Sequence, residues 1–167
     1  MKAASPSRAP VPAGLPSLYN FFGPGGVLSK THPAYEFRRG QLDMAQAVEQ
    51  ALSEKRHLVV EAGTGTGKTL AYLVPVIRAG KRVVISTGTK TLQEQLFHKD
   101  VPFLEREAGV GKLRVCYMKG RNNYLCRQKL YDVKDRPVLT GLEQIDHLRV
   151  IVEWEKTTVH GDRAELA

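Results

Sequence analysis

Cysteine is scarce in this sequence, and long apolar runs are absent from its 167 residues. Two cysteines do not build a disulfide framework, and no run reaches the roughly 18 apolar residues that a membrane-spanning helix requires. The N-terminal stretch MKAASPSRAPVPAGLP contains four prolines and no apolar h-region, so it is not typical of a signal peptide. We therefore expect a cytoplasmic protein with a disordered tail over residues 1–16.

Acidic residues are fewer than basic ones, and the formal net charge is +8. Residues 112–136 contain eight lysines and arginines and two aspartates, which is a local excess of +6. A basic excess can serve solubility alone. Its concentration in one short segment favours a polyanionic partner, above all a nucleic acid.

The hydrophobic pattern predicts alternating strands and helices in the first two thirds of the chain. Short apolar runs predict strands over 57–62, 82–87 and 113–118, and helical periodicity predicts helices over 38–56, 68–79 and 89–108, the last interrupted at Pro102. This order predicts an α/β fold, in which helices cover both faces of a parallel sheet. Cys116, in the third strand, is expected to be a small buried hydrophobe. Further on, helices are predicted over 123–134 and about 141–156.

The stretch AGTGTGKT at residues 62–69 fits the P-loop pattern of nucleotide-binding proteins, with alanine in place of the first glycine. A predicted strand precedes it and a predicted helix follows it, which is the context that a P-loop requires. Its backbone N–H groups would surround phosphates, Lys68 would neutralise the β- and γ-phosphates, and Thr69 would ligate Mg²⁺. The predicted ATP contacts of the loop are Ala62, Gly63, Thr64, Gly65, Thr66, Gly67, Lys68 and Thr69, of which Lys68 and Thr69 are the catalytic candidates.

Three flanking motifs carry further candidates. In YEFRRGQLDM, the Gln41 amide can read an adenine edge with Arg38 beside it, although a solvated glutamine at a helix start is an equal alternative. In STGTKTLQEQL, hydroxyls and amides follow a strand, and they can contact a DNA backbone or cap the helix. In KGRNNYLC, basic residues can meet phosphates and a tyrosine can stack on a base or pack internally. The DNA-binding candidates are Thr87, Thr89, Lys90, Thr91, Gln93, Lys119, Arg121 and Tyr124.

These motifs, in this order and spacing, resemble the XPD/DinG family of superfamily 2 helicases, with FFGPGG near the start typical of the bacterial DinG branch. The resemblance covers about residues 18–167. It implies a RecA-like ATP-dependent DNA helicase of DNA repair or replication that moves 5′ to 3′ on single-stranded or forked DNA, as a monomer. It also implies a [4Fe–4S] cluster held by four cysteines in an inserted domain, with Cys126 as the first ligand.

The resemblance divides the chain into part of the first motor domain, residues 17–120, and the start of the cluster insertion, residues 121–167. Family features are missing: no acidic Walker B box, no further cluster cysteines and no second motor domain are present. We reject RVIVEWE, residues 149–155, as a Walker B strand because its apolar residues have helical spacing. We therefore expect an N-terminal piece of a longer helicase, inactive alone and unable to hold the cluster. The alternatives are a natural short paralogue of the family, a non-catalytic nucleotide- or DNA-binding module, and another P-loop enzyme, such as a nucleotide kinase.

Overall fold

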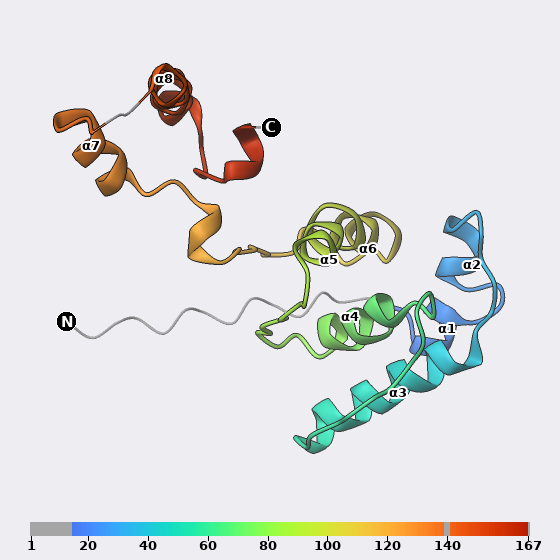
Figure 1. Cartoon of the computed structure of the whole chain (residues 1–167). Coiled ribbons are helices and arrows are strands. Elements are labelled where there is room, and N and C mark those ends of the chain that lie inside the picture. Colours follow the sequence, from blue (N-terminus) through green and yellow to red (C-terminus); the bar gives the residue numbers. More distant parts are fainter. Residues whose placement is uncertain (1–14, 139–140, 167) are drawn as a thin grey trace. The chain divides into compact units, whose positions relative to one another are not determined.

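The computed structural model describes residues 15–138 and 141–166, and the chain divides into two compact units (Figure 1). Unit 1 is Met1–Cys116 and unit 2 is Tyr117–Ala167. The predicted disordered tail lies outside the described residues, except for its last two. No helix in the described part of the chain is long and apolar enough to cross a membrane. The two units divide near the predicted boundary at residue 120, and their assignment to a motor domain and a cluster insertion stays a prediction.

Unit 1 is built from helices whose apolar residues recur at helical spacing. They are α1 (Leu18–Phe22), α2 (Val27–Thr31), α3 (Arg39–Glu54), α4 (Lys68–Arg78), α5 (Lys90–Gln95), a π-helical turn η1 (Leu96–Asp100) and α6 (Val101–Glu107). The predicted helices over 38–56 and 68–79 are confirmed as α3 and α4. The predicted helix over 89–108 is formed as α5, η1 and α6, and its regular α-helical pattern is interrupted by the π-helical turn that ends just before Pro102. Pro102 itself lies in the first turn of α6, where a missing N–H costs little.

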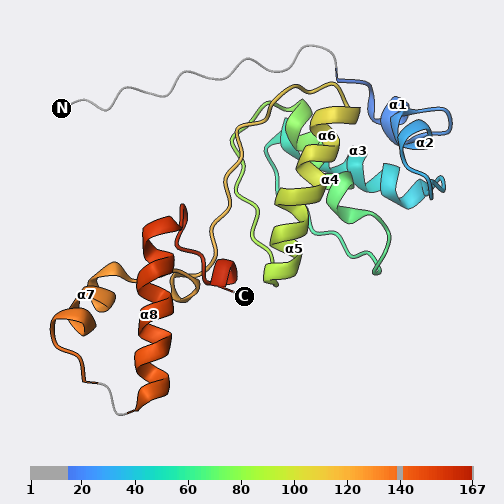
Figure 2. The ribbon, with the colours of Figure 1, turned by 90° about the horizontal axis from the view of Figure 1, so that it is seen from above.

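The core of unit 1 forms where α4 lies along α3, with α1 and the α5–α6 stretch packed around this pair (Figures 1 and 2). Phe21 and Phe22 of α1 are almost fully buried and meet edge to face, with ring centroids 4.9 Å apart. The other buried members are Leu18, Leu28, Leu42, Ala45, Ala71, Leu73, Val74, Leu96, Val101, Leu104, Ala108 and Val110. This apolar packing holds α4, and with it the glycine loop that precedes α4.

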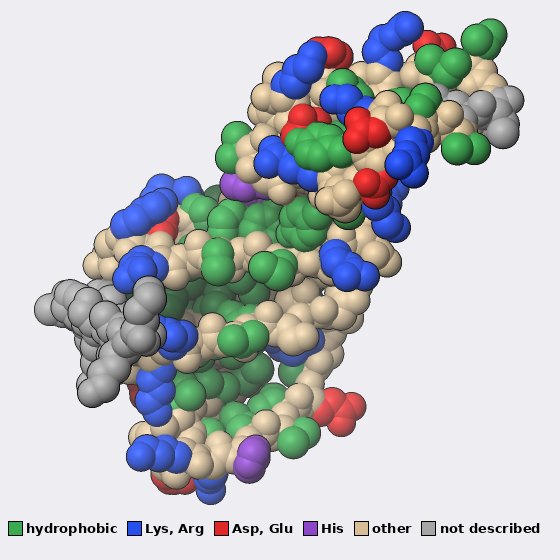
Figure 3. Space-filling view, turned by 90° about the vertical axis from the view of Figure 1, so that its left-hand side faces the viewer, with side chains coloured by type: hydrophobic (Ala, Val, Ile, Leu, Met, Phe, Trp, Pro, Cys, Tyr) green, Lys and Arg blue, Asp and Glu red, His purple; other side chains and the backbone are tan. Residues whose placement is uncertain are grey.

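The predicted parallel sheet is not formed in the described residues. Segments 57–62, 82–87 and 113–118 have no ladder partners there, and Val59 and Val84 are 95% and 93% exposed. An extended segment becomes a strand only when a neighbouring strand satisfies its N–H and C=O groups, so apolar β-type sequence is not sufficient. Hydrophobic side chains therefore remain visible at the surface in Figure 3. Cys116 is exposed for the same reason, and the expectation that it is buried is wrong.

Unit 2 consists of η2 (Arg121–Asn123), α7 (Arg127–Asp135), α8 (Leu142–Thr157) and η3 (Arg163–Leu166). The two predicted helices are confirmed, although α7 begins four residues later than the predicted start at 123. Residues 149–155 lie inside α8, so the rejection of RVIVEWE as a strand is also confirmed. The turns η2 and η3 lie side by side (Figures 1 and 2), and Arg163 Nη1 donates to the Asn122 carbonyl at 3.3 Å.

Candidate nucleotide-binding site

The glycine loop of unit 1 leads directly into the N-terminus of α4. Gly65 and Gly67 have φ angles of 74° and 78°, a left-handed conformation that side chains disfavour. Gly67 is the N-cap of α4, so the loop turns sharply and the first N–H groups of the helix face the loop. These N–H groups lie at the positive end of the helix dipole, which favours an anion.

Lys68 lies over its own loop. Its Nζ donates to the Ala62 carbonyl at 2.8 Å and also to the Gly63 carbonyl. Thr66 Oγ1 donates to the same Gly63 carbonyl at 3.0 Å. The ammonium is therefore held at the mouth of the loop by neutral acceptors, which are weaker partners for a charged donor than phosphate oxygens.

Arg38 and Gln41, the predicted adenine contacts, are both attached to the P-loop backbone. Gln41 Nε2 donates to the Gly67 carbonyl at 3.0 Å, and Arg38 Nη1 donates to the Gly65 carbonyl. A Cβ atom added at Gly67 would lie 2.1 Å from Gln41 Nε2, so the Gln41 amide would have to move, while the positive φ angle is what favours glycine here. The sequence predicted which residues meet the nucleotide region, and the structure adds that they brace the loop itself.

A cavity of about 530 Å³ lies beside this brace. Its lining comes from three places: the start of α3, the end of the segment before the loop, and the loop itself. The lining residues are Arg38, Gly40, Gln41, Asp43, Met44, Ala47, Val60, Glu61, Ala62 and Thr66. Apolar side chains from α3 together with the guanidinium and amide groups suit a flat, polar-edged ring such as a purine.

Thr69 and Tyr72 connect the loop to the α5–α6 stretch. Burial raises the pKa of the Tyr72 hydroxyl, a hydrogen bond with Thr69 opposes this rise, and the nearby carboxylate of Asp100 adds to it. Burial also raises the pKa of Asp100 itself, against a 3.5 Å hydrogen bond from Gln95 and the charge of Lys99. Sequence reasoning missed Asp100, because nothing local relates it to a loop about 30 positions earlier.

The residues predicted to contact a DNA backbone from unit 1 surround the start of α5. Thr89 is the N-cap and accepts from Leu92 N at 3.2 Å, while Thr87 Oγ1 donates to the Thr89 carbonyl at 3.1 Å. Thr89, Lys90 and Thr91 are exposed, and Gln93 is half-buried. Capping by Thr89 is thus confirmed, and DNA contact by these residues stays a prediction.

The candidates in unit 2 are placed differently from one another. Arg121 and Cys126 are exposed, and Cys126 is the N-cap of α7. Lys119 is buried and forms an ion pair with Asp162, an acid that sequence reasoning missed, and Tyr124 Oη accepts from Lys119 N at 2.9 Å. Internal packing, the alternative left open for Tyr124, is therefore present in the structure. DNA contact by all three predicted residues stays a prediction.

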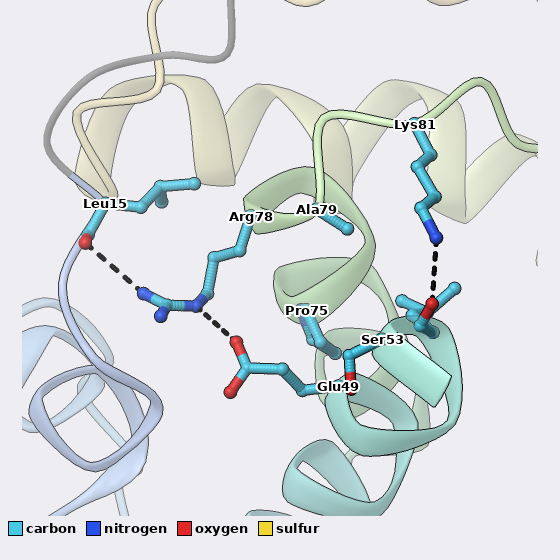
Figure 4. A pocket seen from close by; sticks show the side chains of 8 residues that line it. Leu15, Glu49, Ser53, Pro75, Arg78, Ala79 and Lys81 are labelled. Carbon is cyan, nitrogen blue, oxygen red and sulfur yellow. Dashed lines mark hydrogen bonds and ion pairs between the residues drawn. The ribbon is translucent and has the colours of Figure 1, made fainter. Parts of the chain in front are cut away.

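A second pocket of about 460 Å³ lies at the other end of α4, away from the loop (Figure 4). Arg78 donates to Glu49 Oε1 at 2.7 Å and to the Leu15 carbonyl at 3.3 Å, and Lys81 donates to the Leu52 carbonyl at 2.8 Å. Both cations are thus used to tie α4 and the following turn to α3 and to the start of the described chain. This pocket is a structural joint of unit 1.

Comparison with known proteins places these features in a family. Residues 43–158 match the family described as DEAD/DEAH box helicase. The chain is 42% identical to the ATP-dependent DNA helicase YoaA of Haemophilus influenzae over 149 residues, which are 89% of this chain and 23% of that protein. It is 42% identical to YoaA of Escherichia coli over 145 residues, 84% of this chain and 22% of that protein.

A third relative is the ATP-dependent helicase DinG of Mycobacterium tuberculosis, 40% identical over 151 residues, 77% of this chain and 22% of that protein. The chain thus spans less than a quarter of the length of each of these three relatives. No solved structure matches it. The matched region contains the glycine loop, α4, the α5–α6 stretch and most of unit 2.

Proposed function

Because the chain belongs to the DEAD/DEAH box helicase family, in its DinG-like branch, we propose that it supplies the ATP-binding part of an ATP-dependent DNA helicase. The observation that carries the proposal is the brace of Gln41 and Arg38 on the carbonyls of Gly67 and Gly65. It joins the predicted base-reading residues to the predicted phosphate loop. An adenine ring in the adjoining cavity and phosphates in the loop would then be held by one connected unit.

The donor set of the loop fits a Mg²⁺–nucleotide. Lys68 would exchange its bonds with the carbonyls of Ala62 and Gly63 for the β- and γ-phosphates, where a charge-assisted bond is stronger. Thr69 would place its hydroxyl oxygen toward Mg²⁺, which neutralises phosphate charge when bound. The backbone N–H groups at the start of α4 would donate hydrogen bonds to the remaining phosphate oxygens.

DNA binding is the second part of the proposal. Thr87, Thr89, Lys90, Thr91 and Gln93 would follow the backbone of one strand beside the nucleotide. Arg121 is an exposed guanidinium in the basic segment 112–136 and would meet phosphates as well. We propose single-stranded or forked DNA as the substrate, 5′ to 3′ movement, a monomeric enzyme and a cytoplasmic location. Binding dominated by phosphate contacts should be indifferent to sequence and should weaken steeply with salt.

The iron–sulfur cluster is the third part. A thiolate at Cys126 is the right type of ligand, but the described residues do not by themselves fit a four-thiolate cluster. Within them, no group of three or more His, Cys, Asp or Glu side chains is arranged to hold a metal ion. We propose the cluster only for an intact protein that brings further cysteines to Cys126. Cys126→Ser in that protein should remove its bound iron, and full iron content in the variant would exclude Cys126 as a ligand.

The experiment that tests the nucleotide site uses this chain and a fluorescent ATP analogue with Mg²⁺. Lys68→Ala should weaken binding at least roughly tenfold, because a charge-assisted hydrogen bond contributes about 1.5–3 kcal/mol. Gln41→Ala should weaken binding of the adenine nucleotide more than that of a pyrimidine nucleotide. Lys81→Ala, a lysine on the other side of unit 1, is the matched control and should bind as the parent chain does. Equal binding by all four chains would refute the proposed site.

A further inference from the structure

The described residues of unit 2 contain a buried ion pair between Lys119 and Asp162. Nζ lies 2.7 Å from Oδ2, and the two side chains are 3% and 9% exposed. Burying two charges costs free energy that only good geometry and additional hydrogen bonds offset, so such pairs are uncommon without a specific role. The pair between Lys156 and Glu153 has the same 2.7 Å distance, yet its side chains are 58% and 66% exposed. Burial, and not distance, therefore distinguishes Lys119–Asp162.

Further hydrogen bonds involve Asp162 itself and the backbone next to it. Asp162 Oδ1 accepts from Ala164 N at 3.1 Å, so both oxygens of the carboxylate are used. Tyr124 forms an isolated antiparallel bridge with Asp162, and Leu125 N donates to the Gly161 carbonyl at 2.8 Å. These contacts hold residues 119–125 against residues 158–165 in one register, although α7 and α8 lie between the two segments in the sequence.

The turn after α8 is shaped for this contact. Gly161 has a φ angle of 67°, and its N–H donates to Thr158 Oγ1 at 2.8 Å, which directs its carbonyl toward Leu125. A Cβ atom at Gly161 would lie 3.6 Å from the Leu125 Cβ, an ordinary packing distance, so the positive φ is what favours glycine here. Cys126 directly follows Leu125 and is the N-cap of α7. The register of Leu125 therefore sets where Cys126 lies and where α7 begins.

We propose that Lys119 and Asp162 are positioning residues, which lock residues 119–125 onto residues 158–165 and so hold Cys126 in one place at the start of α7. A buried ion pair suits this task because a slip of one residue would leave two charges buried without partners. That a positioned Cys126 thiol serves as a cluster ligand rests on the proposed function. The locking of residues 119–125 onto residues 158–165 by the ion pair does not depend on that function. In this arrangement the Lys119 ammonium serves the protein and not a phosphate.

A nitroxide label on Cys126, in a chain with Cys116→Ser, tests the positioning directly. The electron paramagnetic resonance spectrum should show an ordered label in the parent chain and a mobile label in Lys119→Met. Lys156→Met, which breaks the exposed pair, is the matched control and should leave the spectrum unchanged. A Lys119→Met spectrum identical to that of the parent would overturn the proposal, since a pair that only adds stability would not move the label.

Hydrogen exchange on the same chains measures the lock itself. Removing one partner of a buried pair should speed exchange of the Leu125 amide by about a hundredfold, while exchange in the middle of α8 should change far less. If Lys119→Met does not fold, the double variant Lys119→Met/Asp162→Leu leaves no unpaired charge and should restore helix content. Its label should still be mobile, because an apolar pair does not specify the register. An ordered label there would refute the positioning role.

The spin-label and hydrogen-exchange measurements are made without metal. They therefore test the positioning role of Lys119 and Asp162 independently of the hypothesis that Cys126 is a cluster ligand. Mobile labels in Lys119→Met, together with full iron content in Cys126→Ser of the intact protein, would support the lock and refute the ligand role of Cys126. An unchanged label, together with loss of iron in Cys126→Ser, would do the reverse.

Discussion

The two units of this chain are stabilised by different means. Unit 1 buries an extensive set of apolar side chains between its helices, from Leu18 of α1 to Val110 beyond α6. In the described part of unit 2, Leu130 is the one buried apolar residue, and a buried ion pair and a bridge join the two ends. Leu142 and Val150 of α8 are 82% and 58% exposed. The contrast shows that helices of similar length can be held by apolar area or by a few specific polar contacts.

This difference has consequences for function. In unit 1 the apolar core is non-directional, so it holds α4 firmly without itself specifying the conformation of the glycine loop. That conformation depends on Gly67 and on the brace from α3. In unit 2 the polar contacts are directional, so a single pair of charges can specify where Cys126 lies. Each unit therefore places its chemical groups through hydrogen bonds, but among the described residues a large apolar core lies behind them in unit 1 alone.

The largest expected effect is in the core of unit 1. Phe21→Ala removes a fully buried ring and should lower the free energy of unfolding by about 3–5 kcal/mol, measured by urea denaturation. Tyr19→Ala, on the same helix but 58% exposed, is the control and should cost far less. Hydrogen exchange should increase in α3 and α4 but not in α7 and α8. Loss of protection in both units together would show that they are not separate.

A smaller effect is expected in unit 2. Leu130→Ala should cost about 2 kcal/mol, at the low end for a buried leucine, because no other apolar residue is buried in the described part of unit 2. Exchange should increase in α7 and α8, while the nucleotide affinity of unit 1 should stay the same. Val133→Ala, on the same helix and 37% exposed, is the control. A cost as large as that of Phe21→Ala would contradict the idea that polar contacts dominate in unit 2.

The brace on the loop should give a third, local effect. Gly67→Ala forces a side chain into a left-handed conformation, which costs roughly 1–2 kcal/mol, and its Cβ displaces the Gln41 amide. Nucleotide affinity should fall together with stability. Gly109→Ala is the matched control, since Gly109 has a similar φ angle of 64° but nothing lies within 4 Å of its Cβ position. It should lose stability without losing nucleotide affinity, and an equal loss of affinity in both variants would argue against the brace.

The smallest effect concerns Glu105, a partly buried, hydrogen-bonded carboxylate of unit 1. A hydrogen bond from Leu113 N at 2.8 Å, with help from Lys112, holds the pKa of Glu105 below its usual value against the effect of burial. Its stabilising contribution is therefore present above the unfolded-state pKa and is lost as pH falls through the lower, folded-state pKa. Glu105→Gln should be less stable than the parent at pH 7 and equal to it in strong acid. A pH-independent difference would exclude the ionised carboxylate as the cause.

Much of the local structure could be predicted from sequence. The helices α3, α4, α7 and α8 follow from apolar periodicity, and the loop before α4 follows from its glycines and lysine. The sheet could not be predicted in the same way, because segments 57–62, 82–87 and 113–118 have β-type sequences but need neighbouring strands to satisfy their backbones. The exposure of Cys116 is a direct result of this difference.

The candidate sites also contain residues that could be predicted from sequence and residues that could not. Arg38, Gln41 and the loop were predicted as nucleotide contacts from their order along the chain, and the structure shows that they touch one another. Asp162 could not be predicted as the partner of Lys119, because a single acid 43 positions away has no local pattern that connects the two. A basic residue in a basic segment looks like a phosphate contact until its partner is known.

The longer helices, the glycine loop before α4 and the family follow from the sequence, because these depend on residue type and spacing along a short stretch of chain. The three-dimensional structure was needed to show which of the described lysines are exposed and which is buried, and which extended segments remain unpaired. Burial and ion pairing depend on groups that are distant in sequence and close in space, so periodicity and motifs carry no information about them. Lys119 is the clearest case, since its environment is set by a turn that comes after two further helices.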